Sequence, residues 1–110
     1  MTTSSTSHQS INNPNAQIEA LHRLVTICLR HQGGGTYPII DFLMGMYNGQ
    51  RWRPNMQLLS GRIDDGYFED VLQVMRLYRL TRMEPHTFFD NGVEIFRELS
   101  TLTKPVRFGN

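Results

Sequence analysis

Apolar residues recur at helical spacing in four segments of the chain. The first segment runs from residue 13 to about residue 30, where Asn13 can cap a helix and Pro14 suits its first position. At 100° per residue its apolar side chains fill an arc of about 140°, and they are Ile18, Leu21, Leu24, Val25, Cys28 and Leu29. Polar residues occupy the opposite face, and the glycines at residues 33–35 end the segment. This pattern predicts one amphipathic helix.

The second and third segments are apolar around more of their circumference. Residues 36–49 carry apolar side chains on every side, and residues 64–80 leave only a narrow polar strip. A helix that is apolar all round is either buried or presents one face to another chain. We therefore expect both helices in the centre of the fold, and the second is also a candidate surface for a homodimer.

Residues 50–61 are expected to begin as a loop at Arg51-Trp52-Arg53-Pro54 and to end in a short helical turn. Pro85 disfavours helix at the residue before it. The last apolar pattern then covers residues 88–102, and Gly92 divides it into a short turn and a helix. No stretch alternates with the period of a strand. The sequence predicts an all-α fold, a compact bundle of four helices with one extra turn.

A chain of 110 residues has the length of one domain. We expect flexible tails at residues 1–12 and 104–110 around a single helical domain at residues 13–103. The Ser/Thr/Gln-rich start lacks the cationic and apolar regions of a secretory signal. The longest apolar run, residues 37–47, is about half of what a membrane span requires. These features predict a cytoplasmic protein with no membrane partner.

The charge and cysteine content exclude several classes of protein. Eleven basic and ten acidic residues give a net charge of +1, which is not the basic balance of a protein that binds nucleic acid by charge alone. A single cysteine excludes an intrachain disulfide framework. Cys28 and His31 have the spacing of two zinc ligands, but no second pair follows, so Cys28 is interpreted as a core thiol. We expect no metal and no cofactor.

Two groups of carboxylates could carry chemistry. The first is bunched at the start of the third helix, as in a magnesium or nuclease site, and consists of Asp64, Asp65, Glu69 and Asp70. The dipole of a helix N-terminus stabilises such acids and is the preferred explanation. The second is Asp41, the only charge in the apolar run of the second helix. Because an unpaired buried carboxylate is costly, we expect Asp41 to lie near a helix end, to pair with an arginine or to reach water, with a functional site as the alternative.

Arginine supplies ten of the eleven basic residues, and its guanidinium group suits phosphate, carboxylate and aromatic partners. Two short arginine patterns are therefore candidate partner-binding surfaces, and their members are Arg51, Trp52 and Arg53 in the loop and Arg76, Arg79 and Arg82 along the third helix. Trp52 could stack on a base or anchor a protein interface. The alternative is that its large ring folds back to cover the core.

Several short patterns resemble those of a small uncharacterised domain family found in bacterial genomes, plasmids and prophages. They are Ala20-Leu21-x-Arg23-Leu24, Gly35 ahead of Ile40-Asp41-Phe42-Leu43, Tyr47-Asn48, and Pro85 with Gly92, Phe96 and Leu99. The likeness covers residues 16–102. The chain departs from the family pattern at residues 33–36, at Tyr47 and at His86, where the family has a Gly-Gln turn, a tryptophan and an aspartate. The resemblance implies a helical domain of mobile-element origin and no established activity.

These observations favour a non-enzymatic protein-interaction module, such as an adaptor or inhibitor of a host complex. An anti-CRISPR or other anti-defence role is the most specific form of this hypothesis. The alternative is a small nucleic-acid-binding accessory protein that uses its arginines and Trp52. The third interpretation is a metal-dependent enzyme that uses Asp41 or the acids at residues 64–70.

Overall fold

The computed structural model describes residues 14–31, 33 and 35–104, and the part of the chain so described is helical. Its elements are α2 (Pro14–Arg30), α3 (Tyr37–Tyr47), α4 (Met56–Gly61), α5 (Asp65–Thr81), the 3-10 helix η1 (Pro85–Phe88) and α6 (Gly92–Ser100). The all-α prediction is confirmed, with four longer helices and short helical turns between them. The tail expected at residues 1–12, the cap at Asn13 and residues 105–110 of the second tail lie outside the described residues.

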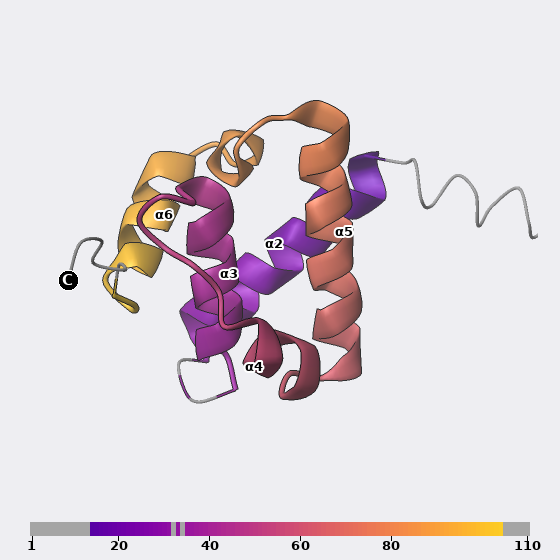
Figure 1. The fold of residues 1–110 in the computed structure, drawn as a ribbon. Helices are drawn as coiled ribbons and strands as arrows, with labels where there is room; N and C mark the ends of the chain where they lie inside the picture. Colours follow the sequence, from indigo (N-terminus) through magenta and orange to yellow (C-terminus); the bar gives the residue numbers. More distant parts are fainter. Residues whose placement is uncertain (1–13, 32, 34, 105–110) are drawn as a thin grey trace, which may run out of the picture.

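Helix α2 runs behind α5 and α3, and both pack on it (Figure 1). Helix α5 lies along α2, α3 packs on α2 and α6, and α4 joins the region of α3 to the start of α5. The core where these helices meet is made of buried apolar side chains, among them Leu21, Leu24, Ile39, Ile40, Leu43, Val74, Leu77, Phe96 and Leu99. Burial of such side chains stabilises the fold by roughly 1.5–3 kcal/mol each.

The central position predicted for the second helix is confirmed in α3. Ile39, Ile40, Leu43 and Met44 have no exposed surface, because α2 lies on one side of α3 and α6 on another. Most of the apolar surface that suggested a homodimer is therefore covered within one chain. The dimer itself stays a prediction, and Tyr37 is the residue of α3 with a large exposed fraction.

The central position predicted for the third helix is wrong. Helix α5 buries Val71, Val74 and Leu77 against α2, but Met75 and Leu80 are about half exposed, with 44% and 51% of their surface open. Apolar residues around the whole circumference of this helix suggested full burial. Within the part of the chain that the structure describes, α2 is the one extensive neighbour of α5, so one side of α5 stays open.

Gly92 allows η1 and α6 to meet closely at the start of α6. A Cβ atom on this residue would lie 1.9 Å from the carbonyl oxygen of His86, which is backbone and cannot rotate away. The break expected at Gly92 is found at that position, since α6 begins there. The close approach keeps His86 and Phe88 of η1 packed beside Phe96, Tyr47 and α2.

Candidate binding groove

The open side of α5 borders an apolar hollow, which we call the methionine groove. It has a volume of about 400 Å³. Its lining comes from α3, the loop after it, α4 and α5, and consists of Phe42, Gly45, Met46, Gly49, Trp52, Arg53, Pro54, Met56, Leu59 and Met75. Nearly all of these side chains are apolar, so the groove offers apolar surface to whatever enters it.

Two glycines of α3 and its end leave room for the groove. Gly45 and Gly49 lie one helical turn apart and line it without side chains of their own. A Cβ atom on Gly45 would lie 3.2 Å from the carbonyl oxygen of Trp52 and 3.3 Å from Cδ of Pro54. Gly45 therefore also lets the loop at residues 52–54 approach α3 closely, and this approach sets the position of that wall.

The loop and α4 hold the wall that faces α5. The side chain of Asn55 accepts a hydrogen bond from the backbone N–H of Leu58 at 3.1 Å, which caps α4. Leu59 of this helix is buried in the core, whereas Met56 keeps 57% of its surface exposed. The short helix is thus fixed by one residue and presents another to solvent at the groove.

The ring of Trp52 folds back toward the core, as in the alternative given above for this residue. Its ring is half-buried and packs against the core cluster, which matches the interpretation that it folds back. Among the described residues its indole Nε1 has no hydrogen-bond partner, although that atom is buried. The guanidinium of Arg51 lies over the ring, with Cζ 5.4 Å from its centre, as in a cation–π contact. Trp52 therefore lines the groove without standing out from the surface.

A second, more polar hollow shares three lining residues with the methionine groove, and we call it the polar cleft. This cleft has a volume of about 570 Å³ and shares Gly45, Met46 and Gly49 with the groove. Its other lining residues are Tyr47, Asn48, Gln50, Tyr78 and Glu84. Nδ1 of His86 lies 3.6 Å from Oε1 of Glu84, which is longer than a hydrogen bond. The carboxylate of Glu84 places an acidic group in the polar cleft.

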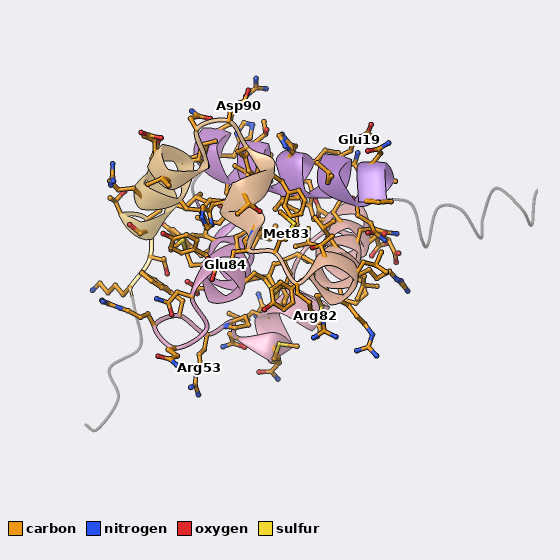
Figure 2. All side chains as sticks on the ribbon, turned by 90° about the horizontal axis from the view of Figure 1, so that it is seen from above. Glu19, Arg53, Arg82, Met83, Glu84 and Asp90 are labelled. Carbon is orange, nitrogen blue, oxygen red and sulfur yellow. The ribbon has the colours of Figure 1, made fainter. Side chains whose placement is uncertain are left out.

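The candidate arginines differ in their distance from the methionine groove. Arg53 lines it and is exposed, and Arg76, Arg79 and Arg82 are exposed along the outer side of α5. Figure 2 shows Arg53 and Arg82 on the side of the molecule away from α2. At 100° per residue, Arg79 lies about 40° from Met75 around α5, and Arg76 lies about 100° from it. The structure thus brings Arg53, Trp52 and the Arg79 side of α5 to one surface.

The bunched acids at the start of α5 do not form one site. Asp64, Asp65 and Glu69 are exposed, while Asp70 turns toward α2 and is buried. Asp41, in α3, is half-buried and accepts a hydrogen bond from the hydroxyl of Thr103. Asp41 was expected to lie near a helix end, to pair with an arginine or to reach water; its side chain stays partly exposed to solvent, and its hydrogen-bond partner among the described residues is a threonine. Within residues 14–31, 33 and 35–104, no three His, Cys, Asp or Glu side chains are grouped to hold a metal.

Sequence reasoning missed the ion pair that joins α2 to α5. Arg23 donates to both carboxylate oxygens of Asp70, at 3.0 Å from Nε and 2.9 Å from the terminal nitrogen. These hydrogen bonds raise the pKa of Arg23 above its ordinary value, although partial burial acts in the opposite direction. Arg23 was assigned to the solvated face of its helix and Asp70 to a helix dipole. Only the packing of α5 on α2 brings the two together.

A histidine on the polar face of α2 makes a second contact that the sequence did not indicate. The ring of His22 stacks on Phe89 with centres 4.0 Å apart, and its Nε2 lies 2.9 Å from the carbonyl oxygen of Phe88. Both partners are more than sixty residues away in the chain. His22 therefore helps to hold the segment around η1 on α2, which is a structural role.

Cys28 is a core thiol, as the sequence predicted. It has no exposed surface, and burial raises its pKa to about 12 from the ordinary value of 9.0. A thiol with a raised pKa is a poor nucleophile and metal ligand at neutral pH. His31, its supposed zinc partner, is exposed at the end of α2.

The chain was compared with models of known protein families, with curated proteins and with solved structures. Residues 18–104 match a family of unknown function, DUF7673. The chain belongs to this family. The match confirms that the patterns in the sequence are those of an uncharacterised domain family, and it spans all the helices that form the groove. No curated protein and no solved structure matches the chain.

None of the helices in the described part of this DUF7673 member is long and apolar enough to cross a membrane. The longest are α2 and α5, with 17 residues each, and both carry charged residues.

Proposed function

We propose that this chain is a protein-interaction module and that the methionine groove receives part of its partner. The groove itself is the observation that carries the proposal. It is a hollow of about 400 Å³, lined almost wholly by apolar side chains, on a small helical protein. Contiguous apolar surface that stays open to water is characteristic of binding sites.

The residue types in the groove suit a protein partner. Met46, Met56 and Met75 have flexible, polarisable side chains that adapt to the shape of an incoming apolar group. Trp52 and Arg53 are of the types that contribute most to the binding energy of protein interfaces. Of the described residues in the lining, Arg53 alone has an ionisable side chain, and a guanidinium is a poor proton donor or acceptor for catalysis. These features favour binding over an enzymatic reaction.

Such a module would act as an adaptor or as an inhibitor of a larger complex. Inhibition of a host defence complex, as by an anti-CRISPR protein, is the most specific form of this proposal. The groove would then bind a segment of the complex that is needed for the assembly of that complex. Acting inside the cell is part of this proposal.

A pair of matched variants tests the proposal. Met75→Glu places a charge in the groove, and Leu80→Glu places the same charge elsewhere on α5, at a residue with a similar exposed fraction. Both residues are exposed, so both variants should fold. Wild-type and variant proteins are immobilised and exposed to an extract of the source cells. Retained proteins are then identified, purified and titrated against each variant by calorimetry.

The expected result is one protein that binds the wild type and Leu80→Glu and loses at least about tenfold in affinity for Met75→Glu, because the charge must be desolvated. The fluorescence of Trp52, the only tryptophan, should change when that partner binds. Equal binding of the partner to all three proteins, or no purified partner that binds, contradicts the proposal.

The exposed row of Arg76, Arg79 and Arg82 supports nucleic-acid binding as a second candidate. Gel shifts with a 20-nucleotide single strand and a duplex at low salt test it directly. Affinity should fall steeply as salt rises and should be lost when the three arginines are changed to glutamine. Absence of a shift at low salt removes this candidate.

A further inference from the structure

The charges around the methionine groove have one sign. Among the described residues, no carboxylate lines the groove, and the one charged lining residue is Arg53. On the opposite wall, Arg79 follows Met75 by one helical turn, and Arg82 follows by two turns, at the end of α5. Glu69 lies about 120° around the helix from Met75, on the same side of α5 as Arg76 but about two turns from it, and away from the groove. The groove is thus an apolar hollow with Arg53 in one wall and with the exposed Arg79 and Arg82 farther along α5 from Met75, and we call these two sides its basic walls.

The adjoining polar cleft reverses this charge at one end. Glu84 lines the cleft, which shares Gly45, Met46 and Gly49 with the groove. In Figure 2, Met83 and Glu84 lie nearer the middle of the view than Arg53 and Arg82. An occupant that follows both hollows meets arginine beside the methionines and a carboxylate beside Tyr78. Its own charges must therefore be distributed unequally along its length.

We infer that the occupant of the methionine groove is an acidic amphipathic helix of a partner protein. Its apolar residues, spaced at i, i+3 or i+4 and i+7, contact the three methionines and Trp52, as in other helix-in-groove complexes. Its aspartate or glutamate residues flank that stripe and meet Arg53 on one wall and Arg79 or Arg82 on the other. The end of the helix that reaches the polar cleft is free of acids, because Glu84 would repel them. This inference rests on the proposed function.

The chemistry of the lining separates this occupant from the alternatives. Among the described lining residues, the side-chain N–H donors are those of Arg53 and the buried indole of Trp52, and the rest of the lining is apolar, so a phosphate backbone would find few partners inside the groove. A second copy of the chain remains a distinct outcome of the test. The basic walls favour a partner that is acidic where it contacts them, because complementary charges speed association and select the partner.

A displayed library of random 16-residue peptides biased toward helix tests the inference without knowledge of the partner. Peptides are selected on the full chain, synthesised and titrated by the change in Trp52 fluorescence. The selected sequences should share an apolar stripe. They should also carry a net negative charge over most of their length, with one end free of acidic residues. Binding should fall when Met75 is changed to glutamate and should persist when Leu80 is changed to glutamate.

Charge reversals on α5 supply the decisive control. Arg79→Glu should weaken a selected peptide about tenfold, whereas Arg76→Glu, the same change on the same helix but away from the groove, should change its affinity less than about threefold. A peptide with its acids replaced by lysines should bind Arg79→Glu more tightly than it binds the wild type. Only a charge contact between peptide and residue 79 gives this exchange.

The possible failures are distinguishable. Selected peptides that are basic or uncharged, yet sensitive to Met75→Glu, overturn the inference and leave the proposed function standing. Light scattering that finds a dimer disrupted by Met75→Glu also overturns it, since the occupant is then a second copy. Selection of no peptide, or only of peptides insensitive to Met75→Glu, contradicts both the inference and the groove as a binding surface.

Discussion

On the side of α5 that faces α2, Val71, Val74 and Leu77 keep at most 2% of their surface exposed, whereas on the side that faces α3, Met75 keeps 44%. The first side is closed by apolar packing and by the ion pair of Arg23 with Asp70. The second side is separated from α3 by the methionine groove. One helix therefore takes part in a sealed interface and in an open one.

The comparison separates what stabilises this protein from what it offers to a partner. Side chains on the sealed side contribute the area buried on folding, so changes there should act on the free energy of unfolding. Side chains on the open side bury little until a partner arrives. Changes there should act on binding and leave stability nearly unchanged, and variants on the two sides of α5 make the distinction measurable.

The largest expected effect is that of Leu77→Ala on the sealed side. Leu77 is 2% exposed, so its truncation leaves a cavity and should lower the free energy of unfolding by about 2–5 kcal/mol. Met75→Ala, two residues earlier, should change it by less than about 0.5 kcal/mol, because Met75 is already hydrated. Urea denaturation of the two variants measures both values. Similar losses in the two variants would show that the open side is as tightly packed as the sealed one.

The ion pair on the sealed side should respond asymmetrically to loss of either partner. Arg23→Met leaves the carboxylate of Asp70, with 11% of its side chain exposed, without a cation, and should cost roughly 2–3 kcal/mol. Asp70→Asn leaves Arg23, whose side chain is 57% exposed and can be hydrated, and should cost about 1 kcal/mol. Thermal and urea unfolding of both variants test the order. Equal costs would indicate that solvent reaches Asp70 freely.

Local patterns were sufficient to predict the helices of this chain. Prolines, glycines and helical spacing located α2, α3, α5 and α6, and the turns at α4 and η1 were expected near their observed positions. Each of these signals lies within a few residues of the feature it predicts. The burial of Cys28 was predictable for the same reason, since its position in the apolar arc of α2 is a local property.

The pairing of helices was not predictable from the same patterns. Arg23 and Asp70 are 47 residues apart, and His22 and Phe88 are 66 residues apart, so no local spacing connects them. The groove exists because α5 packs on α2 and leaves its other side open. An apolar pattern around the whole helix does not show whether a given apolar side chain is buried in the core or exposed at a binding surface. Trp52 and Arg53 were found as candidates by residue type. Met75 and Met56 were not, because an exposed methionine resembles a core methionine in sequence.

Alkaline pH should weaken the sealed side through Cys28. Its pKa is raised by burial to about 12, while in the unfolded chain it is near 9.0. Below pH 9 the thiol is protonated in both states and has no effect. Above pH 9 the unfolded chain releases this proton and the folded chain keeps it, so stability falls, by about 1.4 kcal/mol at pH 10. The difference in unfolding free energy between wild type and Cys28→Ala should shrink by this amount from pH 8 to pH 10. A constant difference would mean that water reaches the thiol in the folded state.

The smallest expected effect on stability has the opposite sign and lies at the open side. Among the described residues Arg82 is the one non-glycine residue with a positive φ, at 58° in the left-handed region, where a Cβ atom is unfavourable. Arg82→Gly should therefore raise the free energy of unfolding by about 0.5–1 kcal/mol, since glycine adopts this conformation readily at a helix end. Arg82→Ala keeps the Cβ atom and removes the guanidinium, and it should leave stability within about 0.5 kcal/mol of the wild type.

If Arg82 contributes to the basic wall of the groove, both variants should bind an acidic helical peptide more weakly by a similar factor, although their stabilities differ. If the peptide affinity of the two variants instead differs in the same way as their stability, Arg82 acts only at the helix end. If both variants lose affinity equally, the guanidinium of Arg82 contributes to peptide binding, and its strained backbone conformation is kept although it lowers the free energy of unfolding.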